Sequence, residues 1–424
     1  CRFTNAVIGK YELLLEHSKI FMALDADISN NTIYDIKKFR KKPVCFIENI
    51  HTGVQNKFKE YYTSKSDVML SKLSTKLNNN EKIIIATNRS ISFMKALKQE
   101  ILEKFPTKTI QLFNSKTIRD PEVSKSVKDT DTWKNYDIVI YSPTISAGVS
   151  VDYEYFDCFF AYFVNNGKVN SMRQMINRVR NFKTNKFYFC LQSYGGSTKP
   201  QNYDEMEKYI TSNRFTEQPN FIFSKQNYDG SKTYPYKNLC YQMWIHDQIE
   251  LAKDKSMFLF NFLRSQYHIG VGSMNYMDIN DDEQSILLEK NIKLKKKVID
   301  TNIYENISNA DIITELEYDK IKKDLEEEKQ ITNDDMDRFK KYNIVKFYSL
   351  DTTQQNKHLG LGKSEFIKKY TNTTVKLAYT NRKKIDEIKK TVNMDSDIFN
   401  GLYIDQTNVA DDLKRKYFGM KLVV

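Results

Sequence analysis

Cysteine is scarce and scattered in this sequence. The chain of 424 residues has five cysteines, an odd number, and no two of them form a Cys-x-x-Cys pair. This pattern argues against a disulfide framework or a zinc site and favours a reducing compartment. Cys158 and Cys190 fall in apolar stretches, so we predict that both are buried packing residues. No metal site is predicted.

Long apolar runs are also absent. No run approaches the roughly 20 residues that a membrane-spanning helix needs, and no signal-like segment opens the chain. The sequence therefore predicts a soluble intracellular protein without a membrane partner. Because Cys1 rather than Met stands first, we expect the chain to be a piece of a longer protein.

A phosphate-binding loop of the form Gly-x-x-x-x-Gly-Lys-Ser/Thr is missing as well. Nucleotide motors hold their phosphates with this loop and their magnesium with an acidic pair. Residues 360–364 end like such a loop, but Lys357 stands where the leading Gly belongs. We therefore predict that Ser364 caps a helix instead.

Positive charge is present in excess, and it is unevenly distributed. The net charge is +12. Residues 1–200 contain 31 Lys and Arg against 19 Asp and Glu, whereas residues 201–424 contain 35 of each kind. A basic surplus confined to one region predicts a partner with a phosphate backbone, namely nucleic acid.

Short apolar strands and helices alternate between residues 80 and 198. Strands are expected at 83–86, 109–113, 137–141, 158–164 and 186–191, and helices at 91–105 and 171–180. Alternation of this kind predicts an α/β fold with a parallel sheet. Gly195 and Gly196 mark a boundary, so we predict three parts, residues 1–79, 80–198 and 199–424.

The strand at 137–141 leads into a polar turn that contains Thr144, Gly148 and Asp152. In open α/β sheets this rim is where ligands bind. The long polar stretch at 114–133 is expected to be a loop over the sheet, along which a nucleic-acid strand could lie.

The helix predicted at 171–180 carries an amide and two guanidinium groups. Gln174 and Arg178 stand four positions apart and should share one face. Arg180 follows two positions later. Guanidinium groups bind phosphate oxygens as bidentate forks, so this helix predicts contact with a polyphosphate.

Four segments of the chain resemble a known family, and they occur along the chain in the same order as in that family. Residues 144–152 followed by Gln174-x-x-x-Arg178-x-Arg180 resemble motifs V and VI of superfamily 2 helicases. The strand end Thr87-Asn88-Arg89-Ser90 resembles motif IV, and residues 21–27 resemble the closing strand of the first motor lobe. Within that superfamily the likeness is to the origin-of-replication binding proteins of herpesviruses and other large DNA viruses.

The resemblance implies a RecA-like second helicase lobe that works with ATP and Mg²⁺. Thr87, Asn88 and Arg89 would touch the DNA backbone, and Thr144 would couple DNA to the nucleotide site. Gly148 and Asp152 would line that site. Gln174, Arg178 and Arg180 would meet the phosphates, with either arginine as the arginine finger. ATP and Mg²⁺ would be held mainly by a first lobe, of which residues 1–79 would be the end and the connector. The acids Asp25 and Asp27 would make a contact between lobes rather than bind metal.

Residues 199–424 are predicted to be a mainly helical accessory region. Apolar residues between Trp244 and Leu263 fall at helical spacing, which is more typical of a core than of a platform for stacked bases. Ser308 and Thr332 each precede an acid by three positions, so both are predicted to begin helices.

Together these features predict the C-terminal part of an ATP-dependent DNA helicase or origin-binding protein of viral replication. It would bind single-stranded DNA or the origin duplex and other replication proteins, in the host cytoplasm or nucleus. The alternative is a non-enzymatic initiator or scaffold module that binds DNA or protein partners. An RNA helicase also remains open, because a motor that tracks the backbone need not read the 2′-hydroxyl.

Overall fold

The computed structural model describes six main stretches of the chain. They are residues 59–145, 149–212, 239–268, 274–277, 283–327 and 331–347, with residue 329 and short pieces within 10–45, 225–234 and 367–371. Most of the strand predicted at 21–27, the loop at 360–364 and Gly148 lie outside the described residues. No helix in the described part of the chain is long and apolar enough to cross a membrane.

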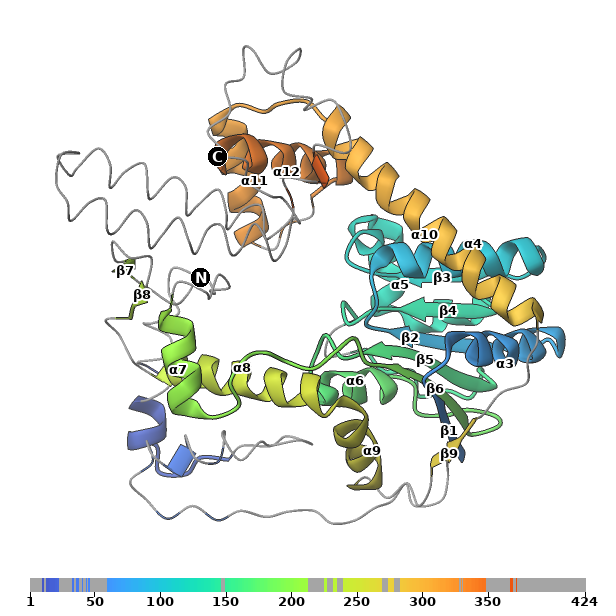
Figure 1. Ribbon diagram of the computed structural model, residues 1–424, viewed down its shortest axis with the longest axis horizontal. Coiled ribbons are helices and arrows are strands. Elements are labelled where there is room, and N and C mark those ends of the chain that lie inside the picture. Colours follow the sequence, from blue (N-terminus) through green and yellow to red (C-terminus); the bar gives the residue numbers. More distant parts are fainter. Residues whose placement is uncertain are drawn as a thin grey trace, which may run out of the picture.

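A seven-stranded sheet forms the centre of the fold, in the order β3-β4-β2-β5-β6-β1-β9 (Figure 1). Its strands are β1 (Lys59–Thr63), β2 (Ile83–Thr87), β3 (Ile110–Phe113), β4 (Ile138–Tyr141), β5 (Cys158–Val164), β6 (Lys186–Gln192) and β9 (Met274–Tyr276). Every pairing in this sheet is parallel. The predicted α/β fold with a parallel sheet is therefore confirmed.

Burial on both faces explains why the central strands are apolar throughout. Every residue of β2, β4 and β5 is buried, as expected for parallel strands that are covered by helices on each side. One face packs against α3 (Ser66–Asn78), α4 (Ile91–Lys104) and α10 (Glu283–Asn309). The other face packs against α6 (Val169–Ile176) and α9 (Phe258–His268). Cys158 and Cys190 are buried in this core, as predicted.

The sheet draws strands from all three predicted parts of the chain. β1 comes from before residue 80, and it pairs with β6 on one side and with β9 on the other. The 27-residue helix α10 then returns across α3 and α4, where Lys295 pairs with Glu100 and Glu103. The boundaries at 79 and 198 stay predictions, but residues on both sides of each boundary pack into one body.

Three predictions about local structure are wrong. The residues at 114–133 do not form an open loop, because they fold into η1 (Thr117–Arg119), α5 (Pro121–Lys128) and η2 (Thr130–Asn135). The carboxylate of Asp120 caps α5 and Trp133 is fully buried, which anchors the segment on the sheet. Ser308 begins no helix, since it lies inside α10. The capping box that begins α11 (Glu315–Glu326) is formed by Thr314 and Glu317 instead.

The third wrong prediction concerns the helix at 171–180. Helix α6 ends at Ile176, with Asn177 as its C-cap. The chain then extends, and Val179 forms a parallel bridge with Val151. A β-branched residue suits this extended conformation. Gln174 and Arg178 therefore do not share a helix face.

Beyond the sheet, the described part of the chain is mainly helical, as predicted. Its helices are α7 (Tyr203–Thr211), α8 (Leu239–Ser256), α9, α10, α11 and α12 (Asn333–Phe347), with one small hairpin of β7 (Lys225–Gln226) and β8 (Lys232–Thr233). The apolar stripe from Trp244 onward is buried core, although it spans two helices rather than one. Thr332 begins α12, because its hydroxyl accepts the backbone N–H of Asp335 at 3.1 Å.

Candidate functional site

The carboxyl end of β2 carries the three residues that were predicted to touch DNA. Thr87 is fully buried, and its hydroxyl donates to the carbonyl of Tyr162 at 2.8 Å. Asn88 joins β2 to β5, since its amide donates to the carbonyl of Val164 and its oxygen accepts the Val164 N–H, each at 2.8 Å. The side chain of Thr87 thus fixes the turn and has no surface to offer a ligand in this conformation.

Arg89 is the cation at this end of β2. Its guanidinium lies 3.8 Å from the centre of the Phe93 ring. Its backbone N–H donates to the Thr87 hydroxyl at 3.1 Å, which fixes the start of α4. Ser90 caps that helix by accepting the N–H of Phe93. The sequence thus places a half-buried guanidinium on a rigid helix start, an arrangement that suits a phosphate contact.

The carboxyl end of β4 lies beside that of β2, because the two strands pair in parallel register. Here the Ser142 hydroxyl donates to the Thr144 hydroxyl at 2.9 Å, and the Ser142 N–H donates to the carbonyl of Phe113 in β3 at 3.0 Å. Thr144 is half-buried. The structure therefore brings Thr144 to the same edge of the sheet as Asn88 and Arg89.

Arg178 and Arg180 flank the bridge between Val151 and Val179. The Val151 N–H donates to the Arg178 carbonyl at 2.8 Å, and the Arg180 N–H donates to the Val151 carbonyl at 3.0 Å. Val179 is buried in the core. In an extended segment alternate side chains point to opposite sides, so both arginines lie on the other side of this segment from Val179.

The two arginines differ in what they contact. Arg178 is half-buried, and its Nη1 donates to the Val149 carbonyl at 3.5 Å. Its Nε is buried and finds no hydrogen-bond partner in the described part of the chain. Arg180 is 66% exposed and lies 3.3 Å from the Asp152 carboxylate, which also accepts the Ser150 hydroxyl. Asp152 is thus the ionic partner of Arg180, and Gln174 stands exposed on α6.

Two buried polar side chains that the sequence analysis did not single out hold this region together. The Tyr141 hydroxyl donates to the Met175 carbonyl at 2.7 Å, near the end of α6, and burial raises the pKa of Tyr141. The Asn165 amide donates to the carbonyls of Gly195 and Lys255 at 2.7 and 3.0 Å, which ties α8 to the sheet. Asn165 could have been identified from the sequence, because it is a polar residue directly after the apolar strand β5.

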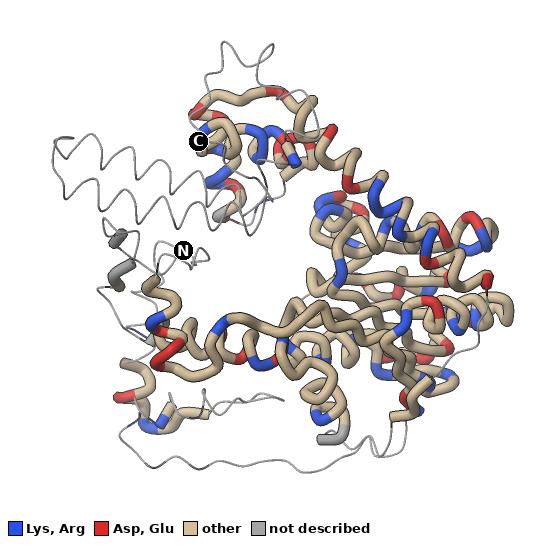
Figure 2. Tube along the Cα trace, viewed as in Figure 1, with Lys and Arg blue, Asp and Glu red and all other residues tan. Residues whose placement is uncertain are grey.

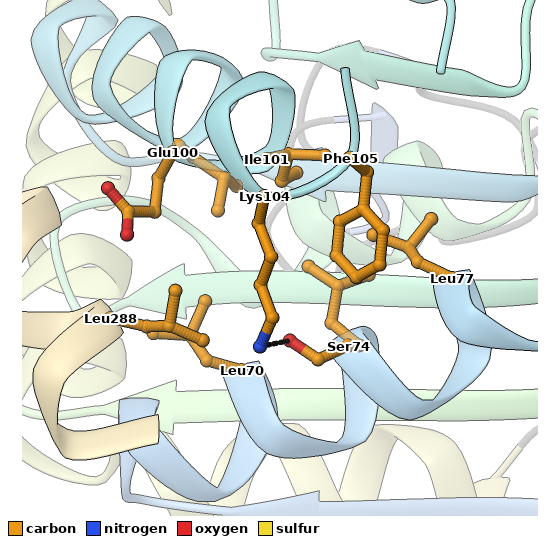
Figure 3. Close-up of a pocket in the computed structure, with 10 residues that line it drawn as sticks. Leu70, Ser74, Leu77, Glu100, Ile101, Lys104, Phe105 and Leu288 are labelled. Carbon is orange, nitrogen blue, oxygen red and sulfur yellow. Dashed lines mark hydrogen bonds between the residues drawn. The ribbon is translucent and has the colours of Figure 1, made fainter. Parts of the chain in front are cut away.

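Two cavities lined by described residues lie away from Arg178 and Arg180. A cavity of about 20 Å³ lies between α3, α4 and Leu288 of α10, where Lys104 donates to the Ser74 hydroxyl at 3.5 Å (Figure 3). That volume suits a water molecule rather than a nucleotide. A second pocket, of about 230 Å³, lies between α11 and α12. No group of three or more His, Cys, Asp or Glu residues within the described ranges could hold a metal ion.

Comparison with known proteins gives one family. The family model described as "Origin of replication binding protein" matches residues 25–206, which include β1 to β6 and the start of α7. A "Putative helicase/primase complex protein" of African swine fever virus is 28% identical over 385 residues, which is 89% of this chain and 35% of that protein. This chain therefore spans about a third of the length of that relative.

Shorter matches have names of the same kind. A "Putative replication origin-binding protein" of Acanthamoeba polyphaga mimivirus is 26% identical over 190 residues, 43% of this chain and 22% of that protein. A "Replication origin-binding protein" of Gallid herpesvirus 2 is 28% identical over 75 residues, 17% of this chain and 9% of that protein. Through residues 25–206, the chain is similar to the origin-of-replication binding proteins of large DNA viruses.

Proposed function

We propose that this chain is part of a viral DNA replication protein and that it binds DNA along the carboxyl edge of its sheet. The observation that carries the proposal is that residues from two separate segments, Asn88 with Arg89 and Thr144, lie on one edge inside the region that matches the family. DNA-binding proteins hold the duplex or single strand largely through phosphate contacts from Arg, Asn, Thr and backbone N–H groups.

The same region is proposed to act as the second lobe of an ATP-dependent helicase. Arg180 supports this idea because it is exposed and held in place by Asp152, so its guanidinium can reach a phosphate outside this chain. Arg178 contacts the Val149 carbonyl, which suits a positioning residue. ATP and Mg²⁺ would be held mainly by another part of the protein, since this sequence has no phosphate-binding loop. Arginine at such a position would stabilise charge on the transferred phosphoryl group.

A non-enzymatic DNA-binding or scaffold module is the second candidate. It would need only the backbone contacts at the carboxyl edge of the sheet. In either case we propose other replication proteins as partners, in line with the name of the African swine fever virus relative. The two candidates differ in ATP hydrolysis by the full-length protein.

Replacement of Arg89 by Ala is expected to weaken binding to a single-stranded oligonucleotide. Loss of one phosphate contact should reduce the salt slope by about 0.7, the value for one contact on single strands. Fluorescence anisotropy at several salt concentrations measures both effects. Lys104→Ala is the matched control, since Lys104 also lies against an aromatic ring but at the far end of α4. Equal salt slopes for Arg89→Ala and Lys104→Ala would contradict the proposed edge.

A further inference from the structure

A second group of cations lies where the helical region meets the sheet body. Lys95 is in α4, Lys116 and Arg119 are at η1, and Lys340 is in α12. We call these four residues the α12 basic cluster. Arg119 connects the sheet body to the helical region, because its Nη1 donates to the side-chain oxygen of Asn333, the first residue of α12, at 3.5 Å. In Figure 2, Lys and Arg recur both on the helical part and on the facing side of the sheet body.

The loop that carries Lys116 is fixed by Asn114. Asn114 is fully buried, and its side-chain oxygen accepts the backbone N–H of Lys116 at 2.9 Å and that of Thr117 at 3.1 Å. This loop follows β3 directly, so it lies at the carboxyl end of that strand. β3 pairs with β4, and β4 pairs with β2. The α12 basic cluster therefore continues the row formed by Thr144 and Arg89.

The cations of the α12 basic cluster lie close enough together to act on the pKa of Lys116. The pKa of Lys116 is lowered, first by burial and next by the positive charge of Lys340, with Lys95 and Arg119 acting in the same direction. Asp337 acts in the opposite direction, and its carboxylate lies 3.7 Å from Lys340. Like charges that are brought together and partly buried are unfavourable unless an anion joins them.

We propose that the α12 basic cluster binds phosphate groups of the DNA backbone, so that α12 of the helical region is part of the DNA interface. This inference rests on the proposed function and extends it, because the family match ends at residue 206 and α12 begins at residue 333. Phosphodiester groups fit better than an acidic peptide, since the cations form a row with the hydroxyl of Thr144, which accepts from Ser142 and keeps its own proton to donate. Such a mixed row is typical of backbone contacts.

The test uses the full chain with the double variant Lys116→Gln and Lys340→Gln. Its affinity for a single-stranded oligonucleotide should fall about tenfold, and the salt slope should drop by about 1.4, which corresponds to two phosphate contacts. The matched control is Lys72→Gln with Lys104→Gln, which removes the same charge from the sides of α3 and α4. The control should leave the salt slope within error of wild type.

A second readout separates binding from a structural role. Without DNA, Lys116→Gln relieves repulsion, so the thermal midpoint should stay the same or rise. A clear drop in the midpoint would mean that Lys116 is structural and would overturn the proposal. Loss of tripolyphosphate binding with DNA affinity unchanged would also overturn it, because the cluster would then serve a small ligand.

The outcomes also separate this inference from the proposed function. Suppose that wild type binds DNA, that Arg89→Ala weakens this binding, and that the double variant matches its control. The proposed DNA contact along the carboxyl edge of the sheet is then supported, and the proposed phosphate contact of the α12 basic cluster is refuted. If wild type shows no salt-dependent DNA binding at all, the proposed function itself fails.

Discussion

Arg180→Ala in the full-length protein should lower DNA-stimulated ATP turnover by about 10³-fold, the scale of a lost arginine finger. The physical reason is that a guanidinium fork stabilises charge that appears only as the phosphoryl group transfers. Arg180 is the exposed arginine of the pair and lies 3.3 Å from the carboxylate of Asp152. Steady-state ATPase assays measure the effect.

Lys183→Ala is the control for this experiment. Lys183 is a partly exposed cation three positions away that pairs with Asp157. Its loss should leave turnover nearly unchanged. Arg180→Lys keeps the charge and removes the fork, so it should rescue turnover only in small part. A full-length protein that keeps its turnover with both Arg178→Ala and Arg180→Ala would refute the motor proposal and leave the scaffold candidate.

The 424-residue chain by itself is expected to hydrolyse no ATP, because its sequence has the arginines and lacks the phosphate-binding loop. A malachite-green phosphate assay with and without DNA measures this. Hydrolysis by this chain alone that Arg180→Ala abolishes would mean that the chain holds its own nucleotide site. The proposal that ATP and Mg²⁺ are held mainly by another part of the protein would then be wrong.

Glu60→Gln is expected to stabilise the fold, and the gain should grow with pH. Glu60 is in β1, 1% exposed, and its Oε2 has no hydrogen-bond partner in the described part of the chain. Its register partners, Phe187 and Met274, share its face of the sheet and pack in the apolar core there. Burial raises the pKa of Glu60 from its ordinary 4.5 to about 8.

The direction of the pH effect follows from that shift. Between pH 4.5 and about 8 the folded protein keeps a proton on Glu60 that the unfolded chain has lost. The free energy of unfolding therefore falls as pH rises through this window and levels off above it. Glutamine has no such proton to lose, so the variant should gain about 2–4 kcal/mol near the upper end of the window and little near the lower end. Urea denaturation near both ends measures the difference.

Glu154→Gln is the matched control, because Glu154 is exposed. Its stability relative to wild type should not change across the window. A Glu60→Gln gain that is constant with pH would show that packing, and not the proton, is the cause.

The apolar strands of the sheet could be predicted from sequence, and the polar ones could not. β2, β4, β5 and β6 are runs of branched and aromatic residues, and their positions matched the expectation within a few residues. β1 reads Lys-Glu-Tyr-Tyr-Thr and β9 reads only Met-Asn-Tyr. Strands so short or so polar form because neighbours in the sheet offer pairing partners. That tertiary cause leaves no pattern in the local sequence.

The candidate site divides in a similar way. Arg89 and Thr144 were identified as side chains that follow strands, and Arg180 as the last residue of a predicted helix. The structure places each of the three at a position with accessible surface. The end of α6 was misplaced because the helical spacing of Met172, Met175 and Ile176 continues to Val179, while the bridge to Val151 is a tertiary contact. The α12 basic cluster joins residues from three distant segments, so only the fold brings it together.

The placement of β1 in the sheet has a consequence for the order of folding during synthesis. β1 emerges from the ribosome first among the seven strands, but its partners are β6 and β9. The side-chain amide of Asn275 donates to the carbonyl of Glu60 across 215 positions. Contacts of such long range are slow to form, because the entropy of closing the intervening loop must be overcome first. The nascent chain should therefore build the β2 to β5 centre early, add β1 once β6 has emerged, and cover the outer edge of β1 only after the residues of β9 have left the exit tunnel. In that interval the backbone N–H and C=O groups on the outer edge of β1 are open to pairing with a neighbouring copy.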